Sequence, residues 1–121
     1  MTAMPAEQLD IEIKEESGVT VIKLAGMIDA LTIERLKQVI EPLCFGAEPR
    51  IVVDCAELQY VNSIGFGLFF AWHRTCRNKG GEFALAGIPE KILGIVRILG
   101  LGNALSIYSS LEEALGPVAR K

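Results

Sequence analysis

The residues of this chain best suited to chemistry are Asn62 and Ser63, which stand between a strand pattern and a helix pattern. The run Ile51–Cys55 predicts a central strand that reaches this pair through a short loop, and an apolar helical stretch follows. Both side chains are of the helix-capping type. A phosphate would be tolerated on a hydroxyl there, because unpaired backbone N–H groups and the helix dipole favour negative charge.

Ser63 also has a simpler interpretation as a plain helix cap. A capping serine stabilises its helix by about 0.5–2 kcal/mol and needs no further function. The residues alone leave both interpretations open.

Other candidate sites are weak. His73 is the only histidine, and the spacing shows no nucleophile and carboxylate to join it, so we expect a partly exposed surface residue. Gly65-Phe66-Gly67 and Gly100-Leu101-Gly102 are incomplete as nucleotide-binding loops. Asp54 and Glu57 are a loop pair without metal-ligand spacing. We therefore predict no enzyme activity, no cofactor and no metal site.

The helix that follows Ser63 is apolar around most of its circumference. Successive helical positions point about 100° apart, so its apolar side chains cannot share one face. Such a helix is either buried on two sides or offers one face to a partner, and both options stay open. The apolar residues are Ile64, Phe66, Leu68, Phe69, Phe70 and Trp72.

The elements that must position these residues follow a regular order. A hairpin with a tight turn at Glu16-Ser17-Gly18 opens the chain, and helices alternate with strands after it. The order ββαβαβαβα predicts an α/β domain with a mixed, mostly parallel sheet of about five strands and about four helices. We expect a flexible tail over residues 1–8 and a single domain over residues 9–118.

Composition excludes several functions. The 121 residues carry a formal net charge of −3 and no basic block, which argues against nucleic-acid binding. The longest apolar run, Ile64–Trp72, is too short to span a membrane, and the N-terminus has no secretory signal pattern. Three widely spaced cysteines predict reduced thiols in a cytoplasmic protein. The oligomeric state is left open.

Six short segments, taken together, carry a family resemblance. They are Gly26-Met27-Ile28-Asp29, Ile51-Val52-Val53-Asp54, Val61-Asn62-Ser63-Ile64-Gly65, Gly80-Gly81-Glu82, Leu99-Gly100-Leu101 and Tyr108–Leu115. Their order and spacing resemble the STAS domain of bacterial anti-sigma factor antagonists, from about Leu9 to Leu115. In that family one serine at the strand-to-helix junction is a phosphorylation switch.

The resemblance implies a function and a site. Ser63 falls on the phosphorylated serine, and Asp29 falls on an acidic residue that lies near it. Asn62 and Ile64 stand where the family usually has Asp and a second Ser or Thr. The expected partner-binding residues are Asp29, Asn62, Ser63, Ile64, Gly65, Phe66 and Phe70.

The partners implied are an anti-sigma factor that is a GHKL-type serine kinase, and a phosphatase. Binding would release a sigma factor, and phosphorylation of Ser63 would end it. The alternative is a constitutive STAS subunit of a lipid-transport or other signalling complex, in which Ser63 is only a cap.

Overall fold

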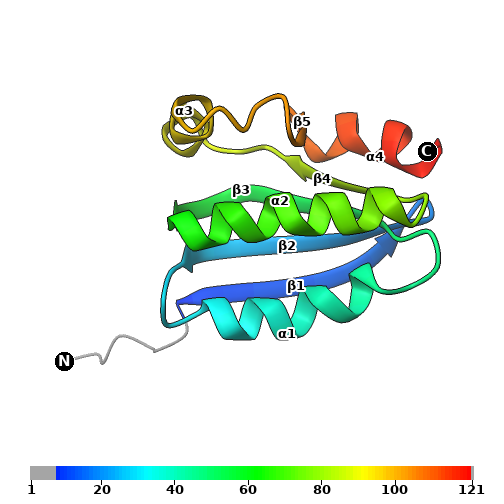
Figure 1. Ribbon diagram of the computed structural model, residues 1–121, viewed down its shortest axis with the longest axis horizontal. Coiled ribbons are helices and arrows are strands. Elements are labelled where there is room, and N and C mark those ends of the chain that lie inside the picture. Colours follow the sequence, from blue (N-terminus) through cyan, green and yellow to red (C-terminus); the bar gives the residue numbers. More distant parts are fainter. Residues whose placement is uncertain (1–7, 121) are drawn as a thin grey trace.

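A five-stranded sheet forms the centre of the protein in a computed structural model, which describes residues 8–120 (Figure 1). The strands are β1 (Leu9–Glu16), β2 (Val19–Ile28), β3 (Arg50–Val61), β4 (Glu82–Ala86) and β5 (Ser106–Tyr108). They lie in the spatial order β1-β2-β3-β4-β5. The first two strands are antiparallel and all later neighbours are parallel, which confirms the predicted mixed, mostly parallel sheet.

The hairpin between β1 and β2 has the two-residue turn that the sequence predicts. Glu16 pairs with Val19, so only Ser17 and Gly18 lie in the loop. Both have positive φ, 57° and 79°, which is the backbone of a type I′ turn. Its twist matches that of the flanking strands, so the turn fixes their register.

Four helices in the described residues complete the predicted order. They are α1 (Ile33–Cys44), α2 (Ser63–Asn78), α3 (Glu90–Ile98) and α4 (Leu111–Arg120). The first two lie side by side over one face of the sheet, and α4 covers part of the other (Figure 1). Of the expected tail at residues 1–8, all but Gln8 falls outside the described residues. The elements run on past residue 118 to Arg120.

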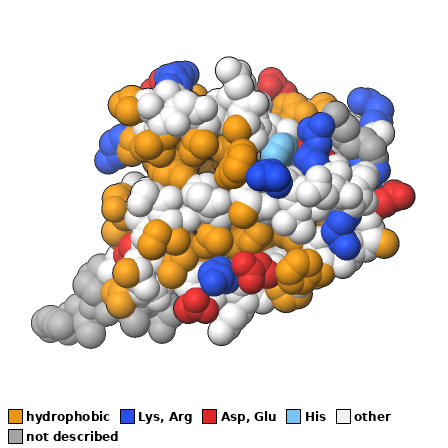
Figure 2. Space-filling model, in the orientation of Figure 1, with side chains coloured by type: hydrophobic (Ala, Val, Ile, Leu, Met, Phe, Trp, Pro, Cys, Tyr) orange, Lys and Arg blue, Asp and Glu red, His pale blue; other side chains and the backbone are white. Residues whose placement is uncertain are grey.

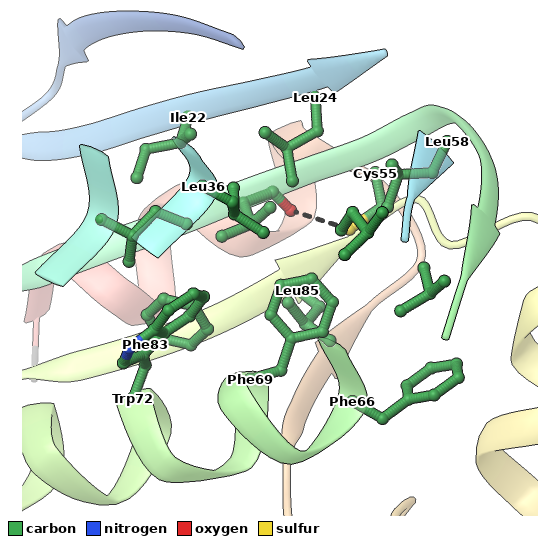
Figure 3. Close-up of a cluster of buried hydrophobic side chains, with 14 of the residues drawn as sticks. Ile22, Leu24, Leu36, Cys55, Leu58, Phe66, Phe69, Trp72, Phe83 and Leu85 are labelled. Atoms are coloured by element: carbon green, nitrogen blue, oxygen red, sulfur yellow. Dashed lines mark hydrogen bonds between the residues drawn. The ribbon is translucent and has the colours of Figure 1, made fainter. Parts of the chain in front are cut away.

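The larger core lies between the sheet and the face covered by α1 and α2. Phe69 and Trp72 of α2 meet Phe83 of β4, with ring centroids 6.1–6.3 Å apart (Figure 3). A second cluster joins Val52 and its strand neighbours to Ala114 and Val118 of α4. Strand β3 is thus covered on both faces over Ile51, Val52 and Val53, as its unbroken apolar run predicts.

Some element boundaries differ from the prediction. Strand β3 does not stop near Cys55 but continues to Val61, so the expected loop before Asn62 is absent. The extra length is paired with β2 through two register shifts, and pairing with a neighbour overrides the local signal. Pro42 lies in the last turn of α1, and the helix ends two residues later at Cys44.

Helix α3 packs on the sheet through a narrow apolar stripe. Pro89 precedes the helix as its N-cap. Ile92 and Val96 are buried, whereas Ile95 and Leu99 are 39% and 50% exposed.

The aromatic cluster gives a matched test of core packing within α2. Phe69 is 1% exposed, so Phe69→Ala should lower the free energy of unfolding by about 3–5 kcal/mol through the cavity it leaves. Phe70 is only partly buried. Phe70→Ala should cost about 1 kcal/mol. Urea denaturation followed by tryptophan fluorescence measures both, and equal losses would refute this assignment of the buried face.

Candidate functional site

The candidate site lies where β3 runs directly into α2. Val61 ends the strand, Asn62 links the two elements, and Ser63 is the first residue of the helix. Val61 pairs with Ile28 at the end of β2, and the Asn62 N–H donates to the Ile28 carbonyl at 2.9 Å. Asp29 and Asn62 therefore follow neighbouring parallel strands at the same edge of the sheet.

Asn62, and not Ser63, caps the helix. Its backbone is extended, and its Oδ1 accepts a hydrogen bond from the Gly65 N–H at 2.8 Å. Among the described residues, no hydrogen bond from the Ser63 hydroxyl is present, and the residue is exposed. The interpretation of Ser63 as the plain cap is therefore wrong, because its neighbour fills that role.

The first turn of α2 packs very closely on the ends of the strands. A Cβ added to Gly65 would lie 2.9 Å from methyl groups of both Ile28 and Val61. Only glycine permits this approach, so Gly65 fixes how deeply the helix N-terminus is seated. Helices leave their first N–H groups without intrahelical partners, and no acidic side chain occupies the first turn of α2. This end of the helix can accept an anion.

Asp29 stabilises the turn that leads into α1. Its Oδ1 accepts hydrogen bonds from the backbone N–H groups of Leu31 and Thr32, at 2.9 and 3.2 Å. Thr32 is buried and in turn accepts from the Asp29 N–H at 3.0 Å and donates to the Met27 carbonyl at 2.8 Å. Asp29 is thus a structural residue of the turn that also lies at the same sheet edge as Asn62.

The other expected partner-binding residues divide between surface and core. Ile64 is 61% exposed beside Ser63, whereas Phe66 is buried and Gly65 has no side chain to offer. Phe70 is half-buried under the Arg74 guanidinium, which lies 5.8 Å from its ring centroid. The expected surface therefore consists mainly of Ser63, Ile64 and the edge of Phe70.

Sequence reasoning missed one exposed apolar residue at this end of the molecule. Leu31, in the turn before α1, is 70% exposed. In the sequence, only its position two residues after Asp29 could have identified Leu31 as part of this surface. In Figure 2 apolar side chains gather around α3 and between α1 and α2, and basic side chains lie at both ends of this face.

His73 belongs to a partly buried polar network at the other end of α2. Its side chain is 13% exposed, so it is partly exposed as expected, and its Nδ1 donates to the Phe83 carbonyl at 2.9 Å. The Glu82 carboxylate is buried and accepts from the Phe83 N–H, Ser106 Oγ and Arg77 side chains at 3.1–3.4 Å. This network ties α2 to β4 and β5.

Within residues 8–120, no cluster of three or more His, Cys, Asp or Glu side chains could hold a metal ion. No helix in the same range has the length and apolar character needed to cross a membrane.

Comparison with known proteins places this geometry in a family. The model of the STAS domain matches residues 10–114, most of the chain. The chain belongs to the STAS domain family. This STAS chain is 29% identical over 109 residues to an anti-sigma-B factor antagonist of Listeria monocytogenes, covering 89% of this chain and 96% of the relative.

Solved structures share the STAS fold. An anti-sigma factor antagonist from Mycobacterium paratuberculosis superposes with a TM-score of 0.85 at 22% identity, covering 99% of this chain and all of the other. The antagonist SpoIIAA in its unphosphorylated form gives a TM-score of 0.76 at 23% identity, with 93% and 98% covered. Its phosphorylated form, from Bacillus, gives 0.69 at 22% identity, with 90% and 99% covered.

Two glycines of α2 test the close packing of its first turn. Gly65→Ala forces a methyl group against Ile28 and Val61 and should destabilise the protein by about 1–3 kcal/mol. Gly67 has no atom within 4 Å of an added Cβ. Gly67→Ala should therefore stabilise by about 0.5–1 kcal/mol through helix propensity. Chemical denaturation of the two variants should shift in opposite directions, and a shared direction would count against the packing described.

The cap can be tested at Asn62. Asn62→Ala removes the acceptor of the Gly65 N–H and should cost about 0.5–2 kcal/mol of unfolding free energy. Asn62→Asp keeps an acceptor and adds a charge favoured by the helix dipole, so it should be at least as stable as wild type. Thermal unfolding at low salt measures both. A stable Asn62→Ala variant together with a destabilised Ser63→Ala variant would show that Ser63, and not Asn62, caps the helix.

Proposed function

We propose that this protein is an anti-sigma factor antagonist that binds its partner through the N-terminal surface of α2 and is controlled by phosphorylation of Ser63. One observation carries the proposal. Asn62 supplies the cap, so the exposed Ser63 hydroxyl at the first position of α2 is not needed to cap the helix. The names of relatives that cover nearly the whole chain support the general role.

The surface around Ser63 suits a partner with an apolar contact. Ile64 is exposed next to it, and Leu31 is exposed at the start of α1. Exposed apolar side chains at one end of a molecule favour protein–protein contact. Unphosphorylated, the domain would dock this surface on an anti-sigma factor, and the sigma factor would be released.

Phosphorylation would oppose that contact without unfolding the domain. A phosphate adds about −1.5 to −2 charges and three acceptor oxygens. The helix dipole favours negative charge at this end by about 0.3–1 kcal/mol, so the fold should tolerate it. In an apolar interface the same hydrated dianion is unfavourable, and a penalty of about 3–4 kcal/mol weakens binding a few hundredfold.

The partners follow from the family resemblance. The anti-sigma factor would be a GHKL-type serine kinase that brings its own ATP and magnesium, and a phosphatase would reverse the modification. The proposal needs no catalytic group on this chain, and it places the protein in the cytoplasm with the transcription machinery. A structural neighbour, SpoIIAA, is known in a phosphorylated and an unphosphorylated form, which supports the idea of two states.

A constitutive STAS subunit is the second candidate. Ile64 and Asn62 stand in place of a hydroxyl residue and an acid that the family usually has, and the exposed Ile64 suits a permanent contact. Such a subunit would keep a stoichiometric partner whose binding ignores phosphatase treatment.

Affinity capture separates the two candidates. Wild type, Ser63→Ala and Ser63→Asp serve as baits in lysate of the source organism, with quantitative mass spectrometry as the readout. We expect wild type and Ser63→Ala to recover a kinase-like anti-sigma factor and Ser63→Asp to lose it about a hundredfold or more, with little change in melting temperature.

Ser110 provides the matched control. Its hydroxyl accepts the Glu113 N–H at 3.2 Å at the start of α4, which packs on the opposite face of the sheet. Ser110→Asp therefore adds the same charge at another helix N-terminus and should leave capture unchanged. Equal recovery of one assembly by all baits would remove the switch and favour the constitutive subunit.

A further inference from the structure

Two of the three cysteines lie at the same end of the paired helices α1 and α2. Cys44 is the last residue of α1, and Cys76 is in the last turn of α2. The helices run in the same direction along the sheet (Figure 1). One turn earlier the Trp72 indole N–H donates to the Glu41 carboxylate at 3.2 Å, which fixes the register between the helices.

This register brings the two thiols to neighbouring positions in the core. Cys44 and Cys76 are 1% and 0% exposed and belong to the same core cluster. The proximity of the two thiols raises the pKa of Cys44 and lowers the pKa of Cys76. Cys76 is thus the sulfur better able to become a thiolate, and Cys44 is the proton donor beside it.

We propose that Cys44 and Cys76 form a redox-active dithiol that closes to an intramolecular disulfide and covalently joins the C-terminal ends of α1 and α2. The oxidant is a hydroperoxide such as hydrogen peroxide. This site is independent of Ser63, which lies at the opposite end of α2.

The reaction balances in two steps. The Cys76 thiolate attacks one oxygen of the peroxide, an S–O bond forms, the O–O bond breaks, and the second oxygen leaves as water after taking a proton. The Cys44 sulfur then attacks the sulfenic sulfur, an S–S bond forms, and the hydroxyl leaves as water with the Cys44 proton. Two thiols lose two electrons and two protons, and one peroxide becomes two waters.

The oxidant reaches the pair from the end of α1. The helix is followed by Phe45, Gly46 and Ala47, all exposed, and Phe45 is 67% exposed. Helix ends open locally at low free-energy cost, so transient fraying of this turn uncovers the sulfur atoms. Cys55 differs from this pair in its access to solvent and in its acidity. It is buried in the middle of β3, burial raises its pKa to about 12, and its Sγ contacts the Val53 carbonyl at 3.6 Å (Figure 3).

Trypsin provides a direct readout, because it places each cysteine on a separate peptide. Cleavage after lysine and arginine gives residues 38–50 with Cys44, 51–74 with Cys55, and 75–77 with Cys76. The reduced full-length protein is treated with a small excess of hydrogen peroxide, alkylated in denaturant with iodoacetamide, digested and analysed by mass spectrometry. We expect peptides 38–50 and 75–77 to be joined, peptide 51–74 to carry the alkyl group, and dithiothreitol to reverse the link.

The intact protein provides a second measurement. Oxidation should remove about 2 Da, and the disulfide should raise the melting temperature by about 5–15 °C relative to the reduced protein. Cys55→Ala, the matched control, should show the same mass loss and the same shift. Cys44→Ala and Cys76→Ala should show neither.

The peptide map of the wild-type protein does not depend on the folding of any variant. Three singly alkylated peptides after peroxide, a link that includes peptide 51–74, or a disulfide between two chains on a non-reducing gel would each overturn the proposal. Irreversible oxidation of Cys76 to a sulfinic acid without the link would overturn it as well.

Discussion

The structure depends on the close contact between the first turn of α2 and the ends of β2 and β3. Gly65 lies so near Ile28 and Val61 that no side chain fits between the helix and the strands. Only Asn62 connects β3 to α2, and its N–H and side chain are both engaged. With no loop to absorb movement, the sheet itself determines where the next residue, Ser63, projects.

The same helix is held at its far end by a different set of interactions. His73 donates a hydrogen bond to the Phe83 carbonyl. The buried Glu82 carboxylate accepts hydrogen bonds from α2, β4 and β5. Between the two ends, Phe69 and Trp72 pack on Phe83. A helix held at both ends and along its buried face resists displacement. Under the proposed function, a phosphate at its N-terminus would therefore change the surface that a partner meets and leave the fold in place.

The sequence predicts the element order well, because turn residues and changes of apolar period mark most boundaries. The turn at Ser17 and Gly18 agrees with the prediction. The extension of β3 to Val61 could not be predicted, since it depends on pairing with β2 across two register shifts. Nor could the burial of Glu82, because its type indicates a surface residue and its partners come from three separate elements. At the site, the sequence indicates that Asn62 and Ser63 stand at a strand-to-helix junction, but which of the two caps the helix depends on the backbone geometry at Asn62.

That division of roles bears on the two departures from the usual family pattern. An aspartate cap would place a permanent negative charge beside the serine, whereas Asn62 caps through a neutral amide oxygen. The positive end of α2 is then not already neutralised, and a phosphate on Ser63 would be the first negative charge in that turn. Ile64 in place of a hydroxyl residue makes the unmodified surface more apolar. Under the proposed function, both changes would widen the contrast between an unmodified and a phosphorylated Ser63, because desolvating a dianion against apolar side chains is more costly than desolvating it among polar ones.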